Sequence, residues 1–339
     1  MSNLVQRISL THGEGGELTH RLIKDVFIKS FGNLQHTQLD AAIIKGSSSK
    51  LAVTTDSYVV KPLFFPGGDI GKLAITGTVN DLAVSGATPQ AITTGFILEE
   101  GFPLRQLKLI VESMAKEAKN AGVSIIAGDT KVVEKGSIDG LFINTTGIGF
   151  VKETNQLRPE DIRVGDTVIV SGTVGDHGIA IVSAREELGL MTDVQSDCAS
   201  LNHLILDLLE KVEGIRVMRD PTRGGMLTAL VELCEEFHCT IELEESLIPV
   251  RQEVEGACDI LGFDPLYLAN EGKVLMIVDK NQKDIVLDIL LNHELGKDAK
   301  VIGQIIECQK EEGKVLLKTP IGSTRRLFRL SGLLLPRIC

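Results

Sequence analysis

The stretch from Gly71 to Gly86 decides the fold, and it reads GKLAITGTVNDLAVSG. Its small and apolar residues predict a helix that is buried on nearly all sides. Asn80 and Asp81 stand in the middle of this helix, and a carboxylate is costly to bury unless a cation or hydrogen-bond donors meet it. A solvated helix face is the usual place for an aspartate, but the apolar neighbours leave little room for one. We therefore interpret Asp81 as part of a functional site.

Strand-like and helix-like runs alternate on both sides of this helix, so each half of the chain is predicted to be an α/β or α+β unit. The 339 residues favour two domains, since one core seldom grows beyond about 250–300 residues. A polar stretch at 155–165 is the expected link. The predicted units are a first domain of residues 1–154, a second of 155–325, and a mobile tail of 326–339. The expected strands are 41–45, 51–55, 91–98, 123–127, 140–151, 167–170, 217–220, 274–278, 301–306 and 315–317.

The composition argues against several classes of protein. The net charge is −11, from 35 basic and 46 acidic residues, which disfavours a nucleic-acid backbone as the main partner. No apolar run reaches the roughly 18 residues of a membrane span. The first seven residues lack the apolar core of a signal peptide, so we expect a cytoplasmic protein. None of the six cysteines forms a Cys-x-x-Cys pair, which makes a structural zinc site improbable.

Two glycine-rich stretches come early in the chain. His12 to Gly16 precedes a helical pattern, and glycines before a helix let backbone N–H groups approach an anion. A mobile terminal loop explains these residues equally well. The stretch 67–73 is not a Walker loop, because its glycine spacing is wrong and Leu73 stands where Ser or Thr must bind magnesium.

The strand at 123–127 is expected to stop at Gly128-Asp129-Thr130-Lys131. Open α/β sheets place their ligands at such strand ends. Asp129 can bind a metal and Lys131 can reach a phosphate, so we favour a site here over a simple turn.

Two motifs in the second half have competing explanations. Residues 220–225 read DPTRGG, and the arginine with its paired glycines suits a phosphate or a docked chain, whereas Asp220 or Thr222 could simply cap the next helix. Asn270 and Glu271 precede a buried strand, where Glu271 could be a general base, a metal ligand or part of a surface turn. In the loop at 171–178, His177 is the residue that we consider for a function.

The chain ends on Pro336-Arg337-Ile338-Cys339, after an apolar run of leucines at 333–335. Chain termini are mobile unless something ties them down. A movable terminal thiol suggests a carrier that docks, reacts and delivers, although a strand that happens to end in cysteine is the alternative. Fully extended, residues 326–339 would span on the order of 45 Å.

Together these motifs resemble the ATP-using superfamily of aminoimidazole ribonucleotide synthetase. Within it, the Pro-Arg-Ile-Cys terminus resembles the HypE family of hydrogenase maturation proteins. The resemblance covers essentially the whole chain. It rests on the terminus and on the stretches 54–56 (TTD), 79–83 (VNDLA), 128–131 (GDTK), 220–225 (DPTRGG) and 270–272 (NEG).

The resemblance implies a two-domain α/β fold, and a homodimer whose N-terminal domains pair strands into a shared barrel. It also implies an ATP site in which aspartates hold Mg²⁺. The implied magnesium ligands are Asp56, Asp81 and Asp129. The other implied nucleotide-binding residues are Lys72, Asn80, Gly128, Thr222 and Asn270.

The implied reaction is the ATP-dependent dehydration of a thiocarbamate on Cys339 to a thiocyanate, whose cyanide goes to the iron of nickel–iron hydrogenase. Removing that oxygen requires a phosphoryl donor, a cation on the transferring phosphoryl group and a base. Lys131 and Glu271 would supply the last two. The implied partners are a HypF-type carbamoyltransferase and a HypC–HypD-type acceptor complex.

Two alternatives remain open at this point. A kinase or synthetase of the same superfamily would act on a free small molecule and would not need Cys339. A non-catalytic scaffold would use the tail only for docking, and it would need neither Lys131 nor Glu271.

Overall fold

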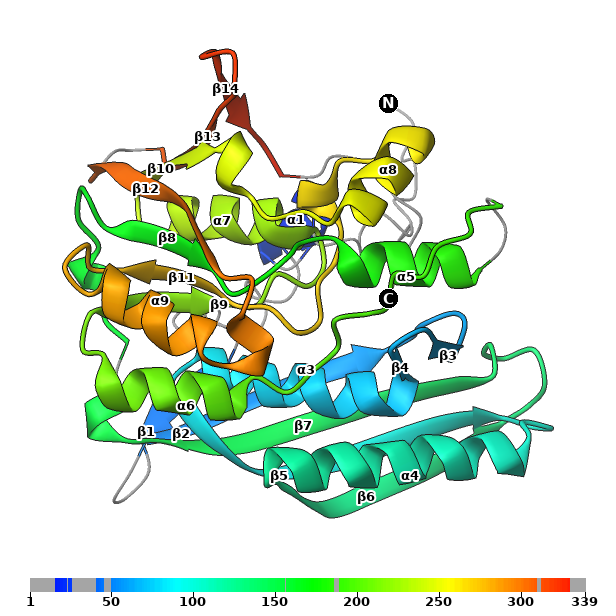
Figure 1. Cartoon of the computed structure of the whole chain (residues 1–339). Helices are drawn as coiled ribbons and strands as arrows, with labels where there is room; N and C mark the ends of the chain where they lie inside the picture. The colour runs from blue at the N-terminus through cyan, green and yellow to red at the C-terminus, as the bar shows by residue number, and fades with distance from the viewer. Residues whose placement is uncertain are drawn as a thin grey trace, which may run out of the picture.

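The computed structural model describes residues 16–22, 24–25, 41–45, 50–155, 157–185, 189–309 and 312–329. These residues form two large mixed sheets with helices packed on them, one sheet from each half of the chain (Figure 1). The first sheet has the strand order β1-β2-β7-β5-β6, and the second has the order β14-β13-β10-β12-β8-β11-β9. The α/β class and the two-part organisation predicted from the sequence are confirmed.

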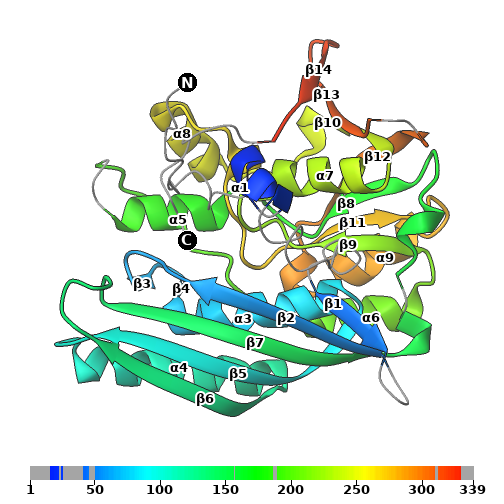
Figure 2. The ribbon, with the colours of Figure 1, turned by 180° about the vertical axis from the view of Figure 1, so that it is seen from behind.

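The first half builds its sheet from antiparallel neighbours, except for the parallel pair β5–β6. Figure 2, the view from behind, shows β2, β7, β5 and β6 in front of α3 and α4, so both helices cover the same face. We call the opposite face the outer face. The elements of this half are α1 (Glu17–Leu22), β1 (Ala42–Lys45), β2 (Lys50–Tyr58), β3 (Phe64–Phe65), β4 (Gly68–Asp69), α3 (Ile70–Val84), β5 (Ala87–Glu99), α4 (Leu104–Ala121), β6 (Ser124–Val133) and β7 (Leu141–Val151).

The second half builds a seven-stranded sheet around β8 and β11, whose residues are all buried. Continuous apolar strands fit a sheet that is covered on both faces. Its elements are β8 (Thr167–Val170), α5 (Asp176–Ala184), α6 (Asn202–Lys211), β9 (Ile215–Arg219), α7 (Gly225–Glu236), β10 (Cys239–Glu244), α8 (Gln252–Leu261), β11 (Leu275–Val278), α9 (Lys283–Leu291), β12 (Lys300–Cys308), β13 (Lys314–Lys318) and β14 (Thr324–Leu327).

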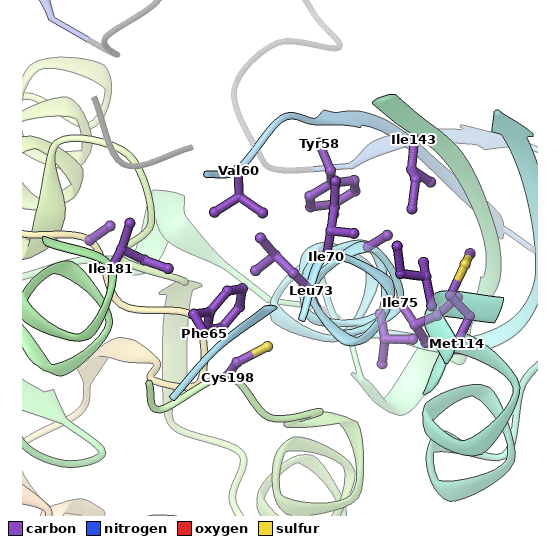
Figure 3. Close-up of a cluster of buried hydrophobic side chains, with 14 of the residues drawn as sticks. Tyr58, Val60, Phe65, Ile70, Leu73, Ile75, Met114, Ile143, Ile181 and Cys198 are labelled. Carbon is purple, nitrogen blue, oxygen red and sulfur yellow. The ribbon is translucent and has the colours of Figure 1, made fainter. Parts of the chain in front are cut away.

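Helix α3 lies between the two halves. Every residue of α3 is buried except Lys72 and Asp81, as its uniformly apolar sequence predicts. Figure 3 shows the helix with Tyr58 and Ile143 of the first sheet on one side and Phe65 and Cys198 on another. One hydrophobic core thus includes residues from both halves.

Every expected strand is present, but the end predicted for the strand at 123–127 is wrong. Strand β6 continues to Val133, because β5 pairs with it in parallel as far as Glu99↔Val133. The motif Gly128–Lys131 therefore lies inside an edge strand rather than in a loop at its end. Five elements were not predicted from the sequence: α8, β3, β4, β10 and β14.

The last described strand, β14, pairs with β13 and includes Arg326 and Leu327. The Tyr267 hydroxyl donates a hydrogen bond to the Phe328 carbonyl at 2.8 Å. Residues 326–328 are thus part of the folded body, although we expected the tail to begin at 326. None of the described helices is long and apolar enough to cross a membrane.

Candidate active site

Asp81 is the acidic residue of α3, and it faces strand β2. The Thr54 hydroxyl of β2 donates a hydrogen bond to Asp81 Oδ2 at 2.7 Å. Both sheet strands and buried helices are rigid elements, so this bond fixes the carboxylate at the contact between the helix and the first sheet. A hydrogen-bond donor therefore meets Asp81, and its place in a functional site stays a prediction.

Asp56 lies two residues further along β2, on the same face as Thr54. The Tyr58 hydroxyl donates to Asp56 Oδ2 at 3.2 Å and is also 3.2 Å from Thr78 Oγ1. Burial, followed by the charges of Asp56 and Asp81, raises the pKa of Tyr58 well above its usual value. The phenol therefore stays protonated and serves as a hydrogen-bond donor.

Glu271 comes from the loop before β11, and its charge environment links it to Asp56. Only 6% of Glu271 is exposed. Burial raises the pKa of its carboxyl well above the usual range, the negative charges of Asp220, Asp197 and Asp56 add to the shift, and Arg223 opposes it. A buried carboxyl of raised pKa holds a proton more readily than a free carboxyl does, which suits a general acid or base.

Asn80 and Asn270 hold the backbone in place, and the nucleotide contacts expected of them stay a prediction. The Asn80 amide is buried, accepts from the Leu201 N–H at 2.8 Å and donates to the Ala199 carbonyl at 3.0 Å. The Asn270 amide is fully buried, accepts from the Gly175 N–H at 2.7 Å and donates to the carbonyl of Pro221 at 3.2 Å. With its oxygen and nitrogen engaged in this way, each amide positions the segments around Glu271.

Asp129 and Lys131 lie apart from Asp56 and Asp81. The register across the sheet aligns Asp56 with Thr145, Thr94 and Gly128. Because neighbouring residues of a strand point to opposite faces, Asp129 and Lys131 are on the outer face, three strands away from β2. A single chain therefore does not gather the three aspartates that we predicted as magnesium ligands. Within the described residues, no group of three or more His, Cys, Asp or Glu is arranged to hold a metal.

Lys72 and Thr222 occupy two other parts of the junction between the halves. The Lys72 ammonium donates to the Gly67 carbonyl at 3.1 Å. Lys72 and Asp81 are nine positions apart in α3, or about 14 Å along the helix axis. Thr222 belongs to the turn before α7, where its carbonyl accepts from the Gly225 N–H at 3.0 Å. Asp220 of the same turn is the charge that acts most strongly on Glu271.

The paired glycines of this turn have a packing role. Gly225 has a φ of +66°, and a Cβ atom on it would lie 2.5 Å from the carbonyl carbon of Tyr267. Only glycine fits this backbone conformation and this contact without strain. The turn therefore lies directly against the segment that leads to Asn270 and Glu271.

His177 is buried and neutral. Burial lowers the pKa of its imidazole to about 4. Its Nδ1 lies 2.8 Å from Ser196 Oγ, and its ring meets Phe65 edge-on at 5.5 Å. These contacts give His177 a structural place beside the site. Residues 12–15 of the glycine loop and Cys339 lie outside the described residues.

Three residues of the site escaped the sequence analysis as functional candidates. Tyr58 could have been found, since strand alternation puts it on the same face as Thr54 and Asp56. Asp220 was considered only as a helix cap. Asp197 stands in an irregular polar segment, and nothing in its sequence neighbourhood indicates its partners.

The chain matches characterised sequence families over most of its length. Residues 38–151 match AIR synthase related protein, N-terminal domain, and residues 163–316 match the corresponding C-terminal domain. The carbamoyl dehydratase HypE of Cupriavidus necator is 46% identical over 335 residues, which cover 98% of this chain and 95% of that protein.

Two solved structures agree with this match. The structure of a HypE–HypF complex has a TM-score of 0.85 and 48% identity, covering 91% of this chain and 99% of that chain. A HypE structure in complex with ATP has a TM-score of 0.82 and 43% identity, covering 98% of this chain and 100% of that chain. This chain therefore belongs to the HypE family of hydrogenase maturation proteins, within the AIR synthase related group.

Proposed function

We propose that this chain is an ATP-dependent carbamoyl dehydratase that acts on its own C-terminal cysteine, Cys339. The observation that carries the proposal is the convergence of Asp56, Asp81 and the buried Glu271 at the junction of the two halves. The relatives named carbamoyl dehydratase and the ATP complex of a HypE protein support it. The product thiocyanate would supply the cyanide ligand for the iron of nickel–iron hydrogenase.

The overall reaction converts Cys–S–C(=O)–NH₂ and ATP to Cys–S–C≡N, ADP, inorganic phosphate and a proton. The carbonyl oxygen attacks the γ-phosphorus, and the bond from that phosphorus to the β-γ bridging oxygen breaks. The C–O bond then breaks and phosphate leaves with the oxygen. Both N–H bonds break as the C≡N triple bond forms. One of the two protons remains on the phosphate at neutral pH, and the other is released.

Glu271 is the group that we assign to the removal of an amide proton. Its carboxyl is shielded from water, so a proton taken from the substrate is held there rather than lost to solvent at once. The nearby charges of Asp220 and Asp197 make the protonated form favourable, which raises the basicity of the ionised form. Cys198 does not compete with Cys339 as a nucleophile, because burial raises the pKa of its thiol above the normal range.

The carboxylates of Asp56 and Asp81 fit a magnesium ion. Each has a hydroxyl donor on one oxygen, and such outer contacts orient metal-binding carboxylates. Mg²⁺ commonly uses one or two carboxylates together with water and substrate phosphates, so two aspartates from one chain are sufficient. When bound, the ion would neutralise charge on the phosphates of ATP.

We further propose that the chain is a homodimer that covers the outer face of the first sheet. Apolar side chains are exposed there and on the edge strand β6: Ile97, Ile125, Ile126, Val132 and Phe150. An uncovered apolar edge strand favours association with another chain. In such a dimer, Asp129 and Lys131 would be enclosed between the two copies, where Lys131 could neutralise a phosphoryl group.

The partners that we propose are a HypF-type carbamoyltransferase and a HypC–HypD-type acceptor of the cyanide. The HypE–HypF complex among the similar structures supports the first. The second follows from the reaction, since a thiocyanate on a carrier thiol needs an acceptor. A cytoplasmic location remains a prediction from the sequence.

Mass measurement of the intact chain tests the function directly. Incubation with a HypF-type transferase and its carbamoyl donor should add the mass of one carbamoyl group, and Mg-ATP should then remove the mass of one water. Cys339→Ala should show neither change. A chain that hydrolyses ATP without gaining the carbamoyl mass would instead favour a small-molecule kinase, and one that does neither would favour a scaffold.

A further inference from the structure

Residues 195–201, between α5 and α6, connect the two halves of the molecule, and we call this segment the clasp. On the side of the first half, the Ser196 N–H donates to the Pro66 carbonyl at 2.8 Å. The Cys198 thiol lies 3.1 Å from the Thr76 hydroxyl, and the Ala199 carbonyl accepts from Asn80 at 3.0 Å. The clasp is therefore bonded both to the β3–β4 hairpin and to helix α3.

On the side of the second half, the Asp197 side chain accepts hydrogen bonds from the backbone of the loop before β11 that carries Glu271. Its Oδ1 accepts from the Glu271 N–H at 3.0 Å, and its Oδ2 accepts from the Gly272 N–H at 3.3 Å. Lys273 lies 3.2 Å from the same Oδ2. One side chain thus holds three consecutive residues of the loop.

The clasp packs closely against its surroundings at two glycines. A Cβ atom on Gly272 would lie 1.9 Å from the Asp197 carbonyl oxygen, and one on Gly67 would lie 2.6 Å from the Ser196 carbonyl oxygen. A Cβ atom closer than 3.0 Å to another heavy atom would force the backbone of the clasp or of its neighbour to shift. The clasp therefore fixes the distance between the hairpin, α3 and the loop that carries Glu271.

Asp197 is also a buried negative charge, with 3% of its side chain exposed. Burial opposes its ionisation, but Lys273 and the Glu271 N–H hold the pKa of Asp197 below its usual value. Its surroundings consequently favour the anionic form of Asp197 beside Glu271. The other charged or titratable groups acting on Glu271 are Asp56 and Tyr58 of β2, Asp220 and Arg223 of the turn before α7, and Cys198 of the clasp.

We infer that Asp197 is a positioning residue for the dehydration: it sets the Glu271 loop in register with the Asp56–Asp81 pair across the junction and fixes the charge that Glu271 experiences. The inference rests on the proposed function, because Glu271 has a role only if a proton is removed there. The clasp, which has no regular secondary structure, would thus align Glu271 of the second half with Asp56 and Asp81 of the first half.

The test uses the full chain loaded with carbamoyl, and it measures the single-turnover rate of water loss at saturating Mg-ATP across a pH series. Asp197→Asn keeps the shape but removes the charge and one acceptor. The expected rate falls about tenfold to a hundredfold, the range for a small misplacement of a reacting group, while the Kd for Mg-ATP changes less than about threefold. The acid limb of the pH profile should move to lower pH, because an anion next to Glu271 is lost.

Lys273→Met gives the opposite electrostatic change, since it removes a cation near the same loop. Its acid limb should move to higher pH. The double variant with Asp197→Asn and Lys273→Met contains no unpaired buried charge, and it should still lose the rate. Asp207→Asn, an exposed aspartate of α6 paired with Lys211, is the matched control and should match the wild type.

A wild-type rate in folded Asp197→Asn would overturn the inference, as would two charge variants whose acid limbs move in the same direction. If neither Asp197→Asn nor the double variant folds, Asp197 is a stability residue and the inference is equally wrong. A wild-type chain that gains carbamoyl but never loses water contradicts the proposed function itself, which separates the two failures.

Discussion

Tyr58→Phe tests whether the Asp56 carboxylate is held in place by a single hydroxyl. The chain has two tyrosines, and the change at Tyr58 removes one oxygen that lies 3.2 Å from both Asp56 Oδ2 and Thr78 Oγ1. A hydrogen bond to a charged group contributes about 1.5–3 kcal/mol and a neutral one about 1 kcal/mol. Asp56 is partly exposed, so water can replace part of the hydrogen bond to its charged carboxylate. We therefore expect a loss of about 1–2 kcal/mol in unfolding free energy.

The functional consequence should be larger than the loss of stability suggests. Asp56 would lose the donor that orients it, and removing such an outer contact costs about 10–100-fold in metal affinity. We expect the Kd for Mg-ATP to rise about tenfold, at the low end of that range. Isothermal titration with Mg-ATP and urea unfolding of the same preparations give the two quantities separately.

Tyr267→Phe is the matched control, because the hydroxyl of Tyr267 makes one hydrogen bond, to the Phe328 carbonyl. It should cost about 0.5–1.5 kcal/mol and leave the Mg-ATP affinity unchanged. Wild-type Mg-ATP affinity in Tyr58→Phe would refute the reasoning, and so would an equal loss of affinity in both variants.

Three further changes have defined outcomes. Asp81→Asn should raise the Kd for Mg-ATP at least about tenfold with little change in unfolding free energy. The control Asp207→Asn should leave both quantities unchanged. If titration calorimetry gives wild-type affinity in Asp81→Asn, Asp81 is not part of the site. Glu271→Gln should abolish water loss yet make the chain more stable than the wild type above about pH 5. The pKa of Glu271 is raised in the folded state, so its contribution to the unfolding free energy is complete below its pKa in the unfolded chain, about 4.3. That contribution is lost as the pH rises through its pKa in the folded chain. If the urea unfolding midpoints of Glu271→Gln and the wild type do not move apart as the pH rises, the predicted gain in stability is wrong. Sedimentation should show a dimer at micromolar concentration, and replacing exposed Ile126 of β6 by Lys should give a folded monomer; a wild-type monomer would exclude the proposed dimer.

Local pattern was sufficient to predict α3, and with it the position of Asp81. A run of small and apolar residues of this length predicts a buried helix. A carboxylate in such a helix needs hydrogen-bond donors or a cation as partners. The same reasoning failed at Gly128, which we interpreted as the end of a strand. Pairing with β5 continues through it, because an edge strand tolerates a glycine when its neighbour supplies the backbone hydrogen bonds.

The functions of the two asparagines could not be predicted, because their partners are distant in the sequence. The Asn80 amide meets the Leu201 N–H across 121 positions, and the Asn270 oxygen meets the Gly175 N–H across 95. A motif shows which residue types occur together but not which atoms they contact. Asn80 and Asn270 stand beside acidic residues in the nucleotide motifs, yet the structure uses them to hold the loops on which the acidic groups depend.

The site is divided between two folded halves, and this explains why a polar helix segment lies in an otherwise apolar interface. Apolar contacts are insensitive to small sliding movements, so a core made only of Ile70, Leu73 and their neighbours would permit several alignments of the two sheets. The buried amide of Asn80 is satisfied in one alignment only, and an unpaired buried amide costs about 1–3 kcal/mol. Asp197 adds the same requirement at the loop that carries Glu271. The buried polar groups therefore select the one arrangement in which the charge of Asp56 on β2 acts on Glu271.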